Sequence, residues 1–269
     1  MDDEKSLLED LDPRYIDIDP LRETYREAIT EYENRFKPPV AVYTALMLID
    51  MQYLDAARGY GLFSHPEQSG VPLEAQEYYF RSLEEIVIPN MQRLLTAFRA
   101  RNIEVIHTRI QSLTKNGRDR SPGHKRLNVH AAPGSKEAEF LAEVAPLDDE
   151  IIINKTASGV FTATNLNYVL TNMQIKHLYM TGVYTNECVS TAVRDASDLG
   201  YFVTLISDAC TTVTHELQQS TLFTLRDRYA RVISTHEALR EIDEVFKHPD
   251  AAVELKNYEN LRSGNNNGQ

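Results

Sequence analysis

The chain has 269 residues, of which 42% are hydrophobic and 25% charged, and its formal net charge is −12. This composition is typical of a soluble globular protein with room for one full-sized α/β domain, and the acidic charge argues against nucleic acid or a membrane as a partner, because both select basic surfaces. The sequence holds no apolar run of about 18 residues, no secretory signal at its acidic N-terminus and too few cysteines for a disulfide framework, so we expect a cytoplasmic protein.

The first 39 residues are highly charged and show no strand pattern. An apolar stripe at helical spacing predicts an amphipathic helix over residues 20–36, and it is formed by Leu21, Tyr25, Ile29 and Tyr32. Lys37-Pro38-Pro39 ends this helix, because proline cannot continue a helix and disfavours helical backbone before it. We expect residues 1–39 to form an arm that packs on the domain or on a neighbouring subunit.

From residue 40 onward, predicted strands and helices alternate. The strands are expected at 41–50, 103–108, 151–154, 177–183, 201–207 and 230–234. The helices are expected at 82–101, 163–172, 186–199, near 216–229 and after the last strand, while 58–72 and 109–133 are predicted to be irregular. This alternation indicates βαβ units, and therefore an α/β domain over 40–248 with a mostly parallel sheet between two helical layers. The polar tail at 249–269 is predicted to be partly disordered.

Three reactive side chains follow predicted strands at the point where each strand ends. Asp50 closes the strand LMLID, Lys155 closes IIINK, and Cys188 follows HLYMTGV within the first turn of the next helix. Thr185 or Asn186 is expected to cap that helix. Because functional groups of parallel sheets collect where strands end, we expect the three side chains to meet at one edge of the sheet.

A cysteine in this position needs help to act as a nucleophile. A free thiol titrates near about 8.5 and is mostly protonated at neutral pH, whereas a helix start and a nearby ammonium both favour the thiolate. We therefore expect Lys155 to stabilise the Cys188 thiolate, while Asp50 takes the thiol proton and later gives it to a leaving nitrogen. Backbone N–H groups at the helix start are suited to stabilise an oxyanion.

Each of these residues also has a purely structural interpretation. A cysteine near a helix start is often a small buried filler, an aspartate after a strand often caps a turn, and a lysine at a strand end is usually solvated. Their joint placement at three strand ends favours catalysis. Cys210, in the segment SDACTT, is predicted to be a packed structural thiol.

Three segments resemble the isochorismatase-like cysteine hydrolases, namely LMLIDMQ, NKTASGVFTATNLNYVL and GVYTNECVSTAVRDASDLGYFVTLISDAC. The resemblance runs from about residue 40 to the last helix and implies a Rossmann-like three-layer α/β/α sandwich. It also implies an Asp-Lys-Cys triad at Asp50, Lys155 and Cys188. In that family a non-proline cis peptide precedes the nucleophile turn, so the bond between Val183 and Tyr184 is expected to be cis, and the N–H groups of Tyr184 and Cys188 are expected to form the oxyanion hole.

The presence of the cysteine favours an amidase over the vinyl-ether hydrolases of the same family. The HTR segment after the second strand and the ASGVF segment resemble the biuret, triuret and ureidoacrylate amidohydrolases. Zinc-binding nicotinamidases carry an Asp-x-His motif after that strand, whereas this sequence has His107 alone. Since His65, His124 and His130 lack ligand spacing, we expect no metal and no other cofactor.

The first motif, DMQYLDAARGYGLF, departs from the common Asp-x-Gln-x-Asp-Phe pattern, so other side chains must shape the pocket. The substrate-binding candidates are Gln52, Tyr53, Phe63, Phe161 and Tyr184. Position 184 is usually small in the family, and Tyr184 either packs or narrows the pocket. The expected substrate is a small acyclic amide or urea-type molecule, hydrolysed through a thioester. An aromatic amide or an inactive binding protein is the alternative, and the resemblance implies a homo-oligomer, either a tetramer or a dimer.

Overall fold

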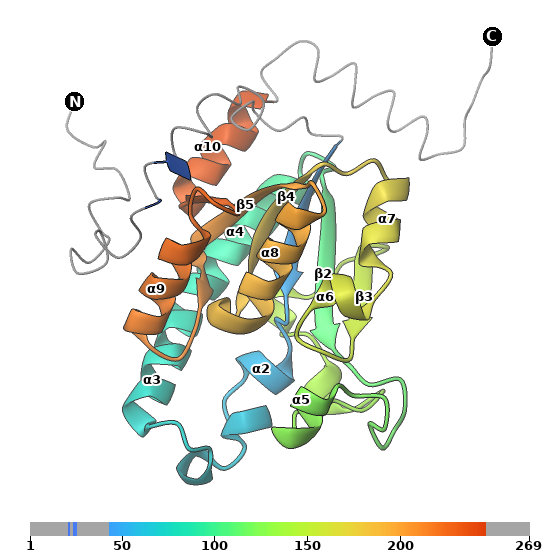
Figure 1. The fold of residues 1–269 in the computed structure, drawn as a ribbon, viewed down its shortest axis with the longest axis vertical. Coiled ribbons are helices and arrows are strands. Elements are labelled where there is room, and N and C mark those ends of the chain that lie inside the picture. The colour runs from blue at the N-terminus through green and yellow to red at the C-terminus, as the bar shows by residue number, and fades with distance from the viewer. Residues whose placement is uncertain (1–20, 22–23, 26–42, 246–269) are drawn as a thin grey trace.

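The computed structural model describes residues 21, 24–25 and 43–245, and its centre is a six-stranded sheet (Figure 1). The strands lie in the order β3-β2-β1-β4-β5-β6, and each neighbouring pair is parallel. Their bounds are β1 (Thr44–Ile49), β2 (Glu104–Ile110), β3 (Ile151–Lys155), β4 (His177–Val183), β5 (Phe202–Thr211) and β6 (Arg231–Ile233). The predicted parallel α/β fold is therefore confirmed.

Helices cover both faces of this sheet and complete a three-layer sandwich (Figure 1). One layer holds α3 (Leu73–Ser82), α4 (Ile88–Arg99) and α10 (Thr235–Val245). The other holds α6 (Val160–Ala163), α7 (Leu166–Asn172), α8 (Ser190–Asp198) and α9 (His215–Leu225). The short helices α2 (Tyr53–Ala56) and α5 (Pro122–Arg126) lie beyond the carboxyl ends of the strands.

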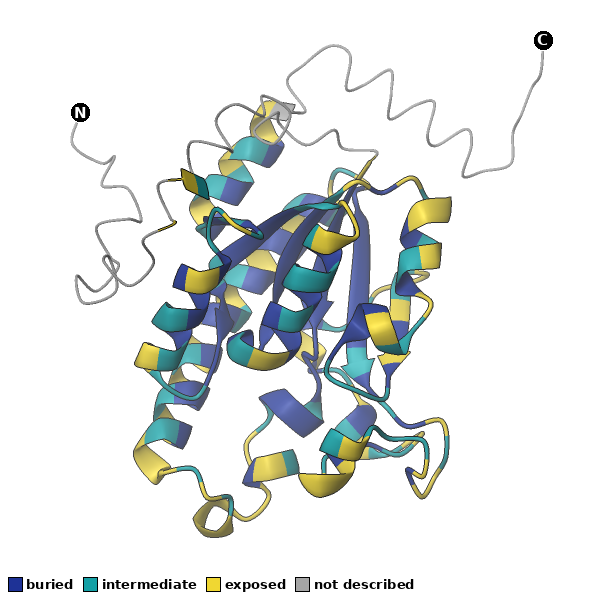
Figure 2. Ribbon diagram, in the orientation of Figure 1, coloured by how far each residue is buried: buried dark blue, intermediate teal, exposed yellow. Residues whose placement is uncertain are grey.

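The sheet is buried on both faces, as Figure 2 shows, because alternate side chains of its central strands enter two separate cores. In β1, Leu46 and Leu48 pack with α3, α4 and α10, whereas Met47 and Ile49 pack with the helices of the other layer. A strand covered on both faces has an almost continuous apolar sequence, and TALMLI fits that description.

The carboxyl end of β4 requires a glycine. Gly182 has a φ of 146°, and a Cβ atom at this position would lie 2.5 Å from the carbonyl oxygen of Ile49. Only glycine permits so close an approach between neighbouring strands. The register between β4 and β5 also shifts between Met180 and Gly182. The chain therefore leaves the sheet at a defined point, two residues before the turn that contains Cys188 begins.

Several predicted bounds differ from the structure. The helix before β2 begins at Leu73 rather than at 82, with a π-helical turn at Leu83–Val87 in its middle, and β5 continues to Thr211. The segment 109–133, predicted to be irregular, contains α5. No helix in the described part of the chain is long and apolar enough to cross a membrane.

The predicted N-terminal arm and the C-terminal tail lie almost wholly outside the described residues. Within 1–39, only Leu21, Thr24 and Tyr25 are described. The Tyr25 ring lies 5.9 Å from the guanidinium carbon of Arg228, in the turn after α9. The arm and its packing therefore stay a prediction.

Candidate active site

The carboxyl edge of the sheet brings together the three reactive side chains predicted to meet there. Asp50 directly follows β1, Lys155 is the last residue of β3, and Cys188 lies in the π-helical turn Thr185–Val189 after β4. Asp50 and Lys155 are fully buried, and Cys188 is 5% exposed. Two ionisable groups are rarely buried so completely without a partner, and here each is the partner of the other.

Lys155 is the centre of this cluster. Its Nζ lies 2.7 Å from Oδ2 of Asp50 and donates to Sγ of Cys188 at 3.3 Å and to the carbonyl oxygen of Ala157 at 3.2 Å. The ammonium group thus makes one ion pair and two hydrogen bonds, all within this cluster. Burial acts to lower the pKa of Lys155, but the Asp50 carboxylate and the Cys188 sulfur outweigh it and raise that pKa above its usual value. Lys155 is therefore a fixed positive charge in contact with the thiol.

Asp50 is held in an unusual backbone conformation. Its φ is 59°, in the left-handed region that few residues other than glycine adopt. The hydroxyl of Thr108 in β2 donates to Oδ1 of Asp50 at 3.2 Å, which leaves Oδ2 to the lysine. Left-handed conformations of non-glycine residues gather at functional sites, because the surrounding structure must enforce them.

The turn before Cys188 differs from the expectation in two ways. The described residues contain no cis peptide bond, so the bond between Val183 and Tyr184 is trans and the predicted cis bond is wrong. The chain turns instead through a left-handed Tyr184, with a φ of 55° and a ψ of 65°. The predicted N-cap is also wrong, because Asn186 accepts a hydrogen bond from the Thr212 hydroxyl and no side chain caps the turn.

Burial and the Lys155 charge act on the pKa of the Cys188 thiol in opposite directions. Burial raises the pKa of the thiol well above its usual value, and the Lys155 ammonium, which lowers it, does not compensate. Asp50 and a second carboxyl group, Asp55, raise it further. A base close to the thiol is therefore needed to accept its proton, and Asp50 is the candidate base in this cluster.

Aromatic side chains form one wall beside the nucleophile turn. The ring of Tyr184 stacks on Tyr79 of α3, with ring centroids 5.4 Å apart and an interplanar angle of 23°. Phe63 is buried behind this pair, 5.9 Å from Tyr79. Tyr184 is thus placed at the site, whereas Phe63 supports the wall from within the core.

Gln52 has another task in this structure. Its side-chain amide donates to the carbonyl oxygens of Ile110 and Glu137 at 2.9 and 2.7 Å, and its oxygen accepts from the Ile110 N–H at 2.5 Å. The amide is buried and joins the ends of two neighbouring strands to the loop before Phe140. These contacts occupy both ends of the amide, so the structure offers Gln52 as a structural link.

Two further substrate-binding candidates, Tyr53 and Phe161, have no hydrogen bond or ring contact with the three reactive side chains in the described part of the chain. The ring of Tyr53 lies 3.8 Å from Nζ of Lys136 and packs edge-on against Tyr60. Phe161 is buried in α6, in the same apolar core as Cys188, and its ring lies 5.9 Å from Tyr201. Their proposed contact with a substrate stays a prediction.

Two residues near the cluster were not singled out as functional from the sequence. Asp55 in α2 is buried, and Asp50, Lys155 and Glu187 all influence its pKa. His124 in α5 is also buried, and burial, with the Lys155 charge, lowers its pKa to about 4, so this imidazole is neutral at neutral pH. In the first motif the second aspartate stands one position later than in the common Asp-x-Gln-x-Asp-Phe pattern, at Asp55. This departure was the feature of the sequence that could have identified Asp55.

His107, which stands alone where zinc-binding nicotinamidases carry a metal motif, is paired with the side chain of Glu150. Its Nε2 lies 3.0 Å from Glu150, which also binds Arg99. Burial acts to raise the pKa of Glu150, but the hydrogen bonds with His107 and Arg99 outweigh it and lower that pKa to about 2. His107 is therefore part of a structural network under the edge of β2.

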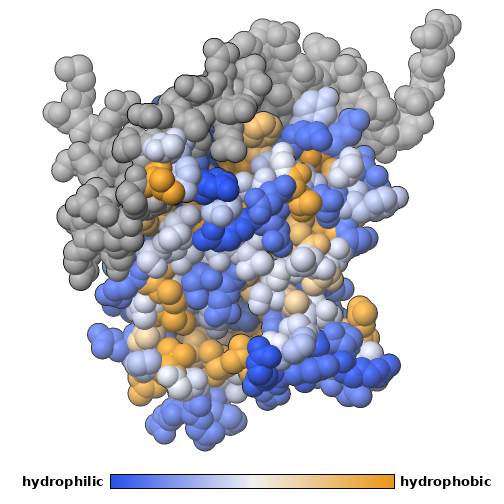
Figure 3. All heavy atoms as spheres, in the orientation of Figure 1, coloured by the Kyte–Doolittle hydropathy of each residue, from blue (hydrophilic) through white to orange (hydrophobic). Residues whose placement is uncertain are grey.

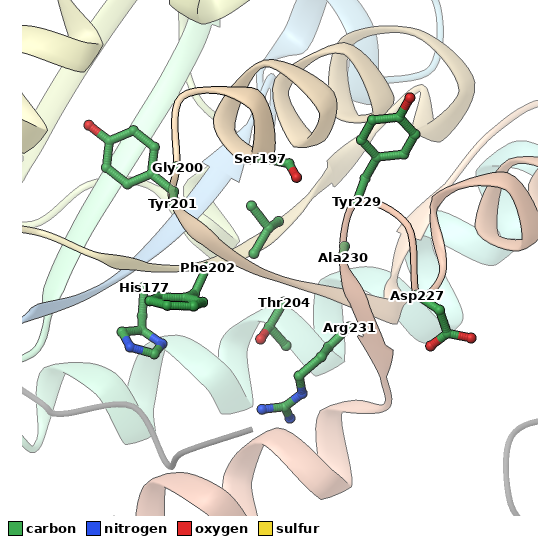
Figure 4. Close-up of a pocket in the computed structure, with 11 residues that line it drawn as sticks. His177, Ser197, Gly200, Tyr201, Phe202, Thr204, Asp227, Tyr229, Ala230 and Arg231 are labelled. Atoms are coloured by element: carbon green, nitrogen blue, oxygen red, sulfur yellow. The ribbon is translucent and has the colours of Figure 1, made fainter. Parts of the chain in front are cut away.

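A cavity of about 120 Å³ lies at the opposite edge of the sheet, where β4 and β5 begin (Figure 4). His177 stacks on Phe202 at 4.8 Å, and Arg231 lies on the same side of the cavity. Since these side chains lie at the amino ends of the strands, the cavity is separate from the Asp50–Lys155–Cys188 cluster.

The chain matches a family of known proteins. The model of the isochorismatase domain matches residues 44–237, a range that includes the whole cluster. Among solved structures, a cysteine hydrolase from Pseudomonas syringae pv. phaseolicola is similar, with a TM-score of 0.63 and 23% identity, over 78% of this chain and 96% of that one. At this identity the likeness shows the fold.

Two curated relatives are named for amide hydrolysis. The N-carbamoylsarcosine amidase of Arthrobacter sp is 26% identical over 171 residues, which are 62% of this chain and 65% of that protein. The ureidoacrylate amidohydrolase of Rhizobium rhizogenes is 25% identical over 215 residues, 72% of this chain and 81% of that protein. The chain thus spans just under two thirds of the first of these relatives.

Proposed function

The chain belongs to the isochorismatase family, and we propose that it is a cysteine-dependent amidohydrolase. It cleaves a C–N bond of a small acyclic amide or urea-type substrate through a covalent thioester. Asp50, Lys155 and Cys188 carry the reaction. The observation that carries this proposal is the buried Lys155 ammonium, which contacts both the Asp50 carboxylate and the Cys188 sulfur.

The first half of the reaction forms the thioester. Asp50 accepts the thiol proton while the Cys188 sulfur attacks the substrate carbonyl carbon, and the C=O electron pair moves to the oxygen. The negative charge passes from the Asp50 carboxylate to the sulfur in this step, and the Lys155 ammonium stabilises it in both places. We place the oxyanion against the backbone N–H groups of Tyr184 and Cys188. The C–N bond then breaks, and the leaving nitrogen takes the proton from Asp50.

The second half uses water as the nucleophile. Asp50 accepts a proton from the water molecule while the oxygen of that water attacks the thioester carbonyl carbon. The C–S bond then breaks, and the sulfur regains a proton. A urea-type substrate passes through a thiocarbamate and gives a carbamic acid, whereas an amide gives a carboxylic acid. Ammonia or an amine is released in the first half, so it forms whether or not the second half is slow.

The burial of Cys188 favours a small substrate over an aromatic amide. Cys188 is 5% exposed, and the stacked rings of Tyr184 and Tyr79 occupy space beside it. The names of the two curated relatives describe a carbamoyl and a ureido substrate, which supports a urea-type molecule here. The complete cluster counts against the third possibility, an inactive binding protein.

A substrate panel tests the proposal. We expect ammonia release from at least one member of a set of carbamoyl amino acids, ureido acids, biuret and short aliphatic amides. We expect turnover of nicotinamide to be slower, because its ring must displace the aromatic wall. Release of ammonia from nicotinamide alone would favour the aromatic alternative, and no turnover across the panel would leave the binding protein as the better description.

Tyr184 is the side chain that we expect to set the size limit. Removing its ring in Tyr184→Ala should raise the ratio of kcat/KM for an aromatic amide to that for the small substrate by about tenfold or more, because the pocket widens. Tyr184→Phe keeps the ring and serves as the matched control. Ratios cancel losses from poor folding, so an unchanged ratio in Tyr184→Ala would assign the ring to packing alone.

We also infer a homo-oligomer, either a tetramer or a dimer, in the cytoplasm. Large apolar side chains remain exposed on the described surface, among them Leu62 and Leu73 near the start of α3. In the face that Figure 3 shows, hydrophobic surface gathers in the lower left, where α3 begins, and hydrophilic surface in the lower right, around α5. The molar mass in solution tests the oligomer directly.

A further inference from the structure

Asp55 is a buried carboxyl group that the proposed reaction does not use, and its charge acts on the Cys188 thiol. It lies in α2, which crosses the carboxyl ends of the strands (Figure 1). The hydroxyl of Tyr79 donates to the Asp55 carbonyl oxygen at 2.7 Å, and the same ring stacks on Tyr184. These contacts connect Asp55 to the turn that carries Cys188, and they fix α2 in place.

The side chain of Asp55 lacks a partner in the described part of the protein. The residue is 9% exposed, and its Oδ2 atom is fully buried without a hydrogen bond. Leaving a buried polar group unpaired typically costs about 1–3 kcal/mol, so such groups call for an explanation. A ligand that supplies the missing hydrogen bond is one such explanation, and the neighbouring nucleophile indicates where that ligand lies.

The surroundings of Asp55 decide its charge. The groups that act on it are Asp50, Glu187 and Lys155, and Asp55 in turn acts on Tyr79, Tyr184 and Cys188. Among these described groups Lys155 alone is a cation, and it is already paired with Asp50 at 2.7 Å. A second negative charge in this buried space has no counterion. Burial, and after it the Asp50 charge, raises the pKa of Asp55 well above its usual value, which favours its neutral form.

We propose that Asp55 binds the substrate beside Cys188, presenting a neutral carboxyl group to the C=O and N–H of one amide edge. A neutral carboxyl offers one O–H donor and one carbonyl acceptor side by side. An unsubstituted carbamoyl or amide group, or the N–H and C=O of a biuret-like chain, presents the complementary acceptor and donor. The two groups form a closed pair of hydrogen bonds, which satisfies the buried oxygen.

This proposal rests on the proposed function and narrows its substrate class. An ammonium group on the substrate would require an ionised Asp55 as its partner. A carboxylate on the substrate would lie among three carboxyl groups here, those of Asp55, Asp50 and Glu187, which would disfavour it. The edge that lies against Asp55 is therefore uncharged. A negatively charged part of the substrate, where one exists, must lie elsewhere in the site.

Two substitutions separate a neutral from an ionised Asp55. Asp55→Asn keeps an uncharged donor and acceptor of the same shape, whereas Asp55→Ala removes both. With the substrate that the panel selects, we expect Asp55→Ala to lose about 30-fold or more in kcat/KM, mainly through KM, because two hydrogen bonds are lost. Asp55→Asn should recover most of that loss. Asp149→Asn, an exposed carboxyl on the loop before β3, is the matched control.

The pH profile gives a second readout that a merely structural role would not move. Because its pKa is raised, Asp55 is neutral below that pKa and ionised above it, so wild-type kcat/KM should fall as the pH rises through that raised pKa and the O–H donor is lost. Asp55→Asn cannot ionise and should lack this decline. If Asp55→Asn is as impaired as Asp55→Ala, or keeps the decline unchanged, the neutral carboxyl is overturned.

Binding of biuret to Cys188→Ala protein distinguishes this proposal from the proposed function. We expect calorimetry to detect binding of biuret to the Cys188→Ala protein. Adding Asp55→Ala should abolish that binding, whereas adding Asp55→Asn should retain it. Biuret binding with this pattern but no turnover of any amide by wild type supports Asp55 and refutes the hydrolase. Turnover that is unaffected by Asp55→Ala refutes Asp55 and leaves the hydrolase intact, and the absence of both binding and turnover refutes both.

Discussion

Replacing Cys188 with alanine should lower the turnover of the selected amide by about 10⁴-fold or more, because no other group in the site can form the covalent intermediate. Cys188→Ser keeps the shape and a hydrogen-bonding atom but supplies a far weaker nucleophile, and it should be almost as impaired. The initial rate of ammonia release, normalised to folded protein from a thermal unfolding curve, measures both. Cys210→Ala is the matched control, since Cys210 is also a buried free thiol.

Alkylation tests the same assignment without a substitution. Both thiols are buried, and burial raises the pKa of each. Only Cys188 contacts a cation among the described residues, at 3.3 Å from Nζ of Lys155, so its thiolate is stabilised once formed. Iodoacetamide should therefore label Cys188 first, in step with the loss of activity, and biuret or the substrate should slow it. A first label on Cys210, or full activity in Cys188→Ala, would refute the nucleophile.

Much of the fold and the position of the cluster followed from local patterns in the sequence. The apolar run of β1 and the alternation of strands with helices indicate a parallel sheet, and parallel strands end at one edge by geometry. That geometry is why Asp50 could be placed together with Lys155 and Cys188, although both lie more than 100 residues after it in the chain. Their contacts in the structure agree with the placement, while their catalytic roles stay a proposal.

The features that the sequence did not reveal depend on contacts between distant segments. The thiol charge of Cys188 is set by how completely the sheet edge is buried, and local rules about helix starts cannot supply that quantity. Asp55 and Tyr79 lie on α2 and α3, and their relation to Tyr184 exists only after the helical layer has packed on the sheet. The role of Gln52 as a link between strand ends arises in the same way, because its partners are backbone groups up to 85 residues away.

Lys155→Met should produce the second large effect, and it acts on stability as well as on rate. We expect turnover to fall by about 10²–10³-fold, because the developing thiolate and the oxyanion both lose a fixed positive neighbour. We also expect the free energy of unfolding to fall by about 3–5 kcal/mol, since the substitution leaves Asp50 charged and buried without its partner. Lys155→Arg is a poor control, because a planar guanidinium does not fit three acceptors arranged around a single ammonium.

The double variant Asp50→Asn/Lys155→Met separates the two effects. Asparagine tolerates the left-handed backbone at position 50 and keeps an acceptor for Thr108, so the buried charge disappears without new strain. Stability should then return most of the way to that of the wild type, because replacing both members of a buried ion pair often costs little. Turnover should not return, because the proton acceptor is now missing as well. Denaturant midpoints and turnover for the four proteins of this cycle measure the coupling.

Two outcomes would contradict these expectations. A double variant as unstable as Lys155→Met would show that the lysine stabilises the fold through contacts other than Asp50. Turnover within a few-fold of wild type in Lys155→Met would remove the lysine from the mechanism.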